Sequence, residues 1–146
     1  MVINLSKFFL ISSIIVVFDQ IGKFLVVGQQ LSTNIIPGIL SITYTQNTGI
    51  AFGLLKGNNL VLAIVSAVVA IGIIVYRKKL ENGLEQMAAA LILGGALSNL
   101  IDRLLRGFVV DYISVPLIPT FNIADAALTA GAALIITRYI MQKYKK

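Results

Sequence analysis

The sequence predicts a membrane α-helical protein with four transmembrane helices and a small extracytoplasmic β-sheet between helices 1 and 2. Of its 146 residues 58% are hydrophobic and only 12% are charged, which a soluble domain of this size could hardly keep in solution. Four apolar segments, at residues 8–27, 60–76, 87–105 and 124–141, have the roughly 17 to 20 residues needed to cross about 30 Å of hydrocarbon. We expect residues 1–146 to form one polytopic domain.

The first apolar segment follows Lys7 and so begins like a cleaved signal peptide. It carries Asp19 and Lys23 and has no small-x-small cleavage site, so we expect it to be retained. Asp19 and Lys23 lie four residues apart and are therefore neighbours on one helix face. Such a pair either lowers the cost of inserting two charges or shapes a polar site.

The segment between the first two helices contains a strand signal. Apolar and hydroxyl residues alternate over residues 40–44, after a break at Pro37-Gly38, which predicts a hairpin or small sheet on the outer surface. The region ends in a polar, glycine-containing turn at residues 46–52. Asn47 could orient a substrate amide there, although asparagine before Thr-Gly more often forms a turn.

The third helix has a ridge of small residues and a polar end. A short connection at residues 77–86, with Asn82-Gly83 as its turn, precedes it, and Gly107 follows as a cap. Ala90, Gly94 and Ser98 recur every four residues and predict close helix packing. Beyond them, Asn99 with Arg103 and Asp102 with Arg106 share helical spacing, which indicates either a buried polar network or a solvated helix end.

Two further aspartates stand near the second outer connection. Asp111 lies between apolar residues, and Asp125 follows Asn122 by three positions, a capping-box spacing. Considered alone, Asp125 is explained as an acid at a helix N-terminus, where the helix dipole stabilises a negative charge. Two carboxylates brought together cannot both ionise cheaply, so one keeps a proton near neutral pH, which is the state an aspartic protease uses.

The distribution of charge predicts the topology. The net charge is +6, and the basic residues gather at the two termini and at residues 77–79, which the positive-inside rule assigns to the cytoplasm. Both termini are then cytoplasmic, and all four aspartates lie toward the outer face. This pattern argues for membrane insertion and against nucleic-acid binding. The chain has no cysteine and no histidine, which excludes disulfides, thiolate or imidazole chemistry and the usual zinc sites.

Five motifs, taken in order, resemble the lipoprotein signal peptidases (signal peptidase II) of bacteria. They are Asp19 with Lys23, Asn47-Thr48-Gly49-Ile50-Ala51-Phe52, Gly94-Gly95-Ala96 through Asn99 to Asp102-Arg103, Val110-Asp111-Tyr112 and Phe121-Asn122-Ile123-Ala124-Asp125. Together they cover essentially the whole chain. The family usually has glycine where this chain has Ser98, which is still small enough for close packing.

The resemblance implies an aspartic endopeptidase of the bacterial inner membrane that removes signal peptides from prolipoproteins, cleaving before a diacylglyceryl-modified cysteine. It implies Asp111 and Asp125 as the catalytic dyad, with no metal or organic cofactor. The expected partners are lipidated prolipoproteins and membrane lipid, with no nucleic acid, and the expected state is a monomer. The implied supporting or substrate-binding residues are Asp19, Lys23, Asn47, Gly49, Ala51, Asn99, Asp102, Arg103, Asn122 and Ala124.

Two other classes compete with a peptidase. A small transporter or proton-conducting subunit would spread its acids through the depth of the bilayer, whereas here they gather toward one side. A non-catalytic assembly factor would need the small-residue faces alone. Neither predicts two aspartates with their flanking motifs at the outer ends of the helices.

Overall fold

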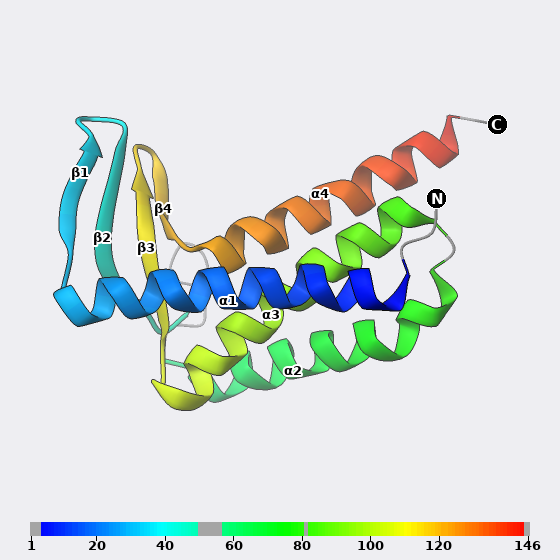
Figure 1. The fold of residues 1–146 in the computed structure, drawn as a ribbon, viewed down its shortest axis with the longest axis horizontal. Helices are drawn as coiled ribbons and strands as arrows, with labels where there is room; N and C mark the ends of the chain where they lie inside the picture. The colour runs from blue at the N-terminus through cyan, green and yellow to red at the C-terminus, as the bar shows by residue number, and fades with distance from the viewer. Residues whose placement is uncertain (1–3, 50–56, 81, 145–146) are drawn as a thin grey trace.

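The computed structural model describes residues 4–49, 57–80 and 82–144, and this part contains four long helices (Figure 1). They are α1 (Leu5–Gln29), α2 (Asn59–Tyr76), α3 (Gly83–Leu105) and α4 (Ile123–Lys143), with a short 3₁₀ turn, η2 (Arg77–Lys79), after α2. Each is long and apolar enough to cross a membrane. The four predicted helices are therefore confirmed.

The predicted turn at Asn82-Gly83 is wrong, because α3 begins there. The side chain of Asn82 accepts a hydrogen bond from the Leu84 backbone N–H at 2.8 Å, and Gly83 is the first helical residue. Asparagine is favoured both in turns and at helix N-caps, and here the capping role prevails.

Helix α3 is the central helix and packs against α1, α2 and α4 (Figure 1). The predicted small-residue ridge explains how closely it packs. A Cβ atom added at Gly94 would lie 2.8 Å from the Ser12 carbonyl oxygen on α1, and one added at Gly95 would lie 2.5 Å from the Ala124 carbonyl oxygen on α4. Only residues without a side chain permit such contacts.

The outer faces of the other helices are apolar and exposed. Phe24 on α1 and Leu60 and Val75 on α2 leave 71 to 72% of their surface uncovered. A helix that exposes large apolar side chains in this way requires apolar surroundings.

A four-stranded antiparallel sheet lies at the end of the bundle opposite both termini (Figure 1). Its order is β1 (Ser32–Ile36), β2 (Leu40–Asn47), β3 (Val109–Val115) and β4 (Ile118–Phe121). The hairpin predicted between the first two helices is confirmed as β1 and β2. Strands β3 and β4 come from the connection between α3 and α4, where the sequence predicted no strand. The pairing sets Asn47 opposite Val109 and Thr45 opposite Asp111.

Candidate active site

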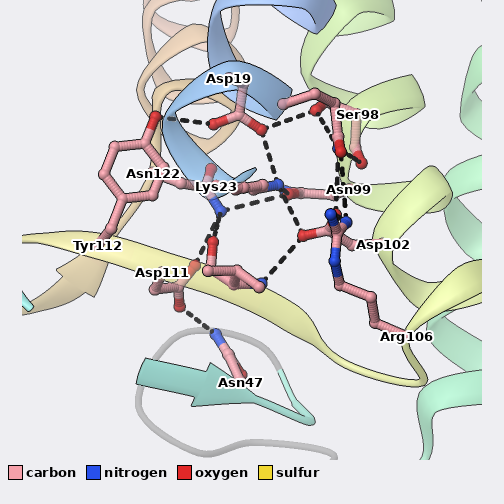
Figure 2. Close-up of polar contacts among 12 residues, drawn as sticks. Asp19, Lys23, Asn47, Ser98, Asn99, Asp102, Arg106, Asp111, Tyr112 and Asn122 are labelled. Carbon is pink, nitrogen blue, oxygen red and sulfur yellow. Dashed lines mark hydrogen bonds and ion pairs between the residues drawn. The ribbon is translucent and has the colours of Figure 1, made fainter. Parts of the chain in front are cut away.

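Asp111 on β3 is buried, and both of its carboxylate oxygens accept hydrogen bonds from amides. Asn47 Nδ2 donates to Oδ2 at 2.9 Å, and Asn122 Nδ2 donates to Oδ1 at 2.8 Å (Figure 2). Asn47 Oδ1 also accepts from the Gly49 backbone N–H at 2.9 Å. Asn47 therefore forms the predicted turn and contacts Asp111 at the same time.

Asp125 lies in the first turn of α4 and is held from two sides. It forms the predicted capping box with Asn122: the Asp125 N–H donates to Asn122 Oδ1 at 2.8 Å, and the Asn122 N–H donates to Asp125 Oδ2 at 3.3 Å. Asn99 Nδ2 on α3 donates to Asp125 Oδ1 at 2.9 Å. The orientation of this carboxylate is thus fixed by α3 and by the start of its own helix.

Asn122 joins the two acids. Its fully buried side chain donates to Asp111 and accepts from the backbone of Asp125, and its Nδ2 also lies 3.1 Å from the Val110 carbonyl oxygen. We call Asp111 and Asp125 the carboxylate pair. The sheet supplies one member and helix α4 the other.

The electrostatics of the pair favour a proton on it near neutral pH. Burial, followed by the charge of Asp125, raises the pKa of Asp111 to about 7, while the Asn47 hydrogen bond, the charge of Lys23 and the Asn122 hydrogen bond act in the opposite direction. A carboxyl with such a pKa is protonated in a large fraction of molecules at pH 7.

Three fully buried charged residues, Asp19, Lys23 and Asp102, form a cluster near Asp111 (Figure 2). Lys23 Nζ lies 2.7 Å from Asp19 Oδ2 and 2.9 Å from Asp102 Oδ2, and it donates to Asn99 Oδ1 at 3.0 Å. The predicted pair of Asp19 and Lys23 is therefore confirmed. Asn99 also links Lys23 to Asp125, because its side chain accepts from Lys23 and donates to Asp125.

Asp102 anchors the strand that carries Asp111. It accepts from the Val110 backbone N–H at 3.0 Å and forms an ion pair with Arg106. Of the two alternatives for the end of α3, the structure therefore shows the buried polar network, built on Asn99 and Asp102. Arg103 lies outside this cluster. Its Nη2 donates to the Gly49 carbonyl oxygen at 3.3 Å, and its own carbonyl oxygen accepts from Asn59 Nδ2 at 3.0 Å.

Two residues of the cluster had no predicted role. Gln20 Nε2 donates to Ser98 Oγ at 3.0 Å and to Asp102 Oδ1 at 3.1 Å, and Tyr112 donates through its hydroxyl to Asp19 Oδ1 at 3.2 Å. The sequence offered no signal for Tyr112, because no strand was predicted at β3 and its four buried residues show no alternation. Gln20 gave no signal beyond standing next to Asp19.

The remaining predicted site residues have different surroundings. Ala124 is fully buried where α4 crosses Gly95. Ala51 lies outside the described residues, as do its neighbours Ile50 and Phe52.

The fold and the buried acids define a multi-pass membrane protein with a paired-carboxylate site. The family model for signal peptidase (SPase) II matches residues 11–141. The lipoprotein signal peptidase of Halothermothrix orenii is 37% identical over 141 residues, covering 94% of this chain and 97% of the relative. That of Syntrophomonas wolfei is 39% identical over 127 residues, covering 84% and 85%.

Solved structures agree with these sequence relatives. A bacterial membrane enzyme determined by the in meso method at 2.3 Å resolution aligns with a TM-score of 0.92 at 34% identity, over 97% of this chain and 92% of that one. A second, determined at 1.9 Å, aligns with a TM-score of 0.84 at 35% identity, over 92% and 93%. The chain belongs to the signal peptidase II family.

Proposed function

We propose that this chain is an aspartic endopeptidase of the bacterial cytoplasmic membrane. It removes signal peptides from prolipoproteins by cleaving before the diacylglyceryl-modified cysteine. Membership of the signal peptidase II family supports the substrate class. The observation that carries the catalytic type is the bridge through Asn122, which hydrogen-bonds the side chain of Asp111 and caps the helix turn of Asp125.

In the proposed reaction the two acids share one proton. The ionised carboxylate takes a proton from a water molecule, the oxygen of that water attacks the scissile carbonyl, and the protonated carboxyl donates to the carbonyl oxygen. The resulting tetrahedral diol collapses as one of its hydroxyl protons returns to a carboxylate and the leaving amine takes a proton from the other acid. No metal or organic cofactor enters these steps.

The surrounding amides hold the acids in position. Asn47 and Asn122 occupy the two oxygens of Asp111, and Asn99 holds Asp125. Lys23 supports Asn99 and lowers the proton affinity of Asp111 through its charge. Arg103 acts differently, because its guanidinium donates to the backbone carbonyl of Gly49 and so holds the segment that follows Asn47.

The proposed orientation has both termini in the cytoplasm and the sheet outside, in a single monomeric polytopic domain. The scissile bond of a lipidated substrate lies at the outer interface, level with the acids. Asp19, Asp102, Asp111 and Asp125 are joined in one network through Lys23, Asn99 and Asn122. This gathering also argues against a transporter, which needs acids along the whole path.

The test is the replacement of each acid by its amide. Asparagine keeps the shape of aspartate but can neither ionise nor share the proton, so Asp111→Asn and Asp125→Asn should each lower the cleavage rate of a lipidated prolipoprotein by at least about 10² to 10⁴. The double variant should be little worse than either single one, because the acids act as a unit. Glu85→Gln is the matched control: it removes one negative charge at the end of the bundle opposite the sheet and should keep full activity. A folded Asp111→Asn or Asp125→Asn protein with near wild-type cleavage would refute the aspartic mechanism.

A further inference from the structure

A groove of about 580 Å³ opens between α2 and α4 at the end of the bundle opposite the sheet. Both helices pack on α3, which forms the floor of the groove. The volume falls within the roughly 300 to 1,000 Å³ typical of small-molecule sites. None of the residues that line the groove belongs to the candidate active site.

The inner part of the groove is apolar. Val69 and Ile73 of α2, Ile92 of α3 and Ile135 of α4 line it. A Cβ atom added at Gly72 would have no heavy atom within 4 Å, so the groove is open at this point of α2. This part suits a hydrocarbon chain.

The mouth of the groove is aromatic and basic. Tyr76 and Tyr139 stand exposed on the two walls, and Lys79 Nζ lies 5.5 Å from the centre of the Tyr76 ring. Arg138 forms an ion pair with Glu85 at 3.3 Å. Exposed tyrosines on membrane helices mark the depth of the lipid headgroups.

The excess of basic residues at the end of the bundle opposite the sheet indicates an anionic ligand. Among the described residues at this end, one acid, Glu85, stands against six bases: Lys7, Arg77, Lys78, Lys79, Arg138 and Lys143. Such an excess attracts anionic headgroups and repels a peptide with a basic end. From Val69 to Tyr76 the groove changes from apolar to basic over about 10 Å, at 1.5 Å per residue along the helix.

We propose that this groove binds one anionic phospholipid, with an acyl chain along its apolar floor and the phosphate at Lys79 and Arg138. The Arg138 guanidinium is shared between the phosphate and Glu85. The proposal does not depend on the peptidase mechanism, because the groove and the carboxylate pair share no residue.

Introduced tryptophan can test the proposal directly, because the chain has no native tryptophan. Val69→Trp reports from the groove, and Val68→Trp reports from a neighbouring position that does not line it. Each variant is placed in dioleoylphosphatidylcholine vesicles with an increasing fraction of brominated phosphatidylglycerol, and quenching gives the preference for the anionic lipid. We expect a preference of about fivefold at position 69, from one net positive charge, and none at position 68.

Charge variants in the Val69→Trp background sharpen the result. Lys79→Gln should lower the preference about fivefold, and Glu85→Gln should raise it about fivefold. Lys7→Gln removes a base of α1 that does not line the groove and should change nothing. If Val69→Trp does not fold, Ile135→Trp on the opposite wall repeats the measurement.

Two results would overturn the proposal. One is an equal affinity for both lipids at position 69 that neither Lys79→Gln nor Glu85→Gln changes. The groove would then be an ordinary lipid-facing crevice. The other is protection of the tryptophan by an added prolipoprotein signal peptide without any preference for phosphatidylglycerol, which would assign the groove to a peptide helix.

Discussion

Replacing Lys23 by methionine should cause a large loss of stability, because its ammonium group is fully buried between Asp19 and Asp102 at 2.7 and 2.9 Å. Breaking a buried ion pair from one side costs about 3 to 5 kcal/mol, since the remaining charge is left uncompensated. Both carboxylates keep other donors, Tyr112 for Asp19 and Arg106 for Asp102, so we expect the lower end, about 3 kcal/mol.

Melting of the purified protein in detergent micelles measures this loss. At roughly 2 to 4 °C per kcal/mol for chains near this size, Lys23→Met should melt about 6 to 12 °C below the wild type. Lys7→Met, a change of an exposed lysine on the same helix, is the matched control and should melt normally. Lys23→Met with Asp19→Asn should recover part of the loss, because one of the two stranded charges is removed.

The same variant should also change the pH profile of cleavage. The charge of Lys23 lowers the pKa of Asp111, so without it that pKa rises above about 7. The alkaline limb, where the carboxylate pair loses its shared proton, then moves to higher pH. An unshifted limb, together with a melting point within a degree or two of the wild type, would refute the role assigned to Lys23.

Three further predictions concern the pH dependence of stability, the packing at Ser98 and the orientation in the membrane. Because the pKa of Asp111 is raised from 3.8 to about 7, the folded protein holds a proton that the unfolded chain has lost, so stability should fall as pH rises from about 4 to about 7, by at most about 4 kcal/mol. Asp111→Asn should flatten this dependence in melting curves, and an unchanged slope would contradict the assignment. Ser98 Oγ donates to the Asp19 carboxylate at 2.7 Å, so Ser98→Ala should cost about 1.5 to 3 kcal/mol and keep activity. Ser98→Leu should impair cleavage, and a fully active leucine variant would exclude close packing there. Cysteine introduced at Asn58 should react with an impermeant reagent outside intact spheroplasts and one at Lys78 should not, and the opposite labelling would reverse the proposed orientation.

The helices could be predicted from the sequence because spanning a membrane requires long apolar runs, and the runs are visible one by one. Strand β3 could not, because four consecutive residues from Val109 to Tyr112 are buried and no alternation of apolar and polar residues remains. Strand β4 has only four residues and contains Pro119, which weakens any strand signal. The sheet therefore depends on contacts between distant segments.

The candidate site was predictable where a charge or amide stands in an apolar setting. Asp111, Asp125 and Lys23 were conspicuous for this reason, and the structure joins them through Asn99 and Asn122. The sequence could not predict which partner each side chain would hydrogen-bond. Arg103 illustrates this, since helical spacing grouped it with Asn99, whereas its guanidinium reaches the backbone of Gly49.

The capping box at the start of α4 ties local helix formation to the state of the site. Asn122 and Asp125 hold each other only while the first turn of α4 is wound, and the same Asn122 holds Asp111. Helix ends fray more readily than helix centres. Unwinding this single turn would release one acid from the bridge and separate the pair, while the rest of the bundle stayed folded. Opening the first turn of α4 would therefore stop the proposed reaction, and amide exchange at Asp125 and Ala126 would report how often this turn opens.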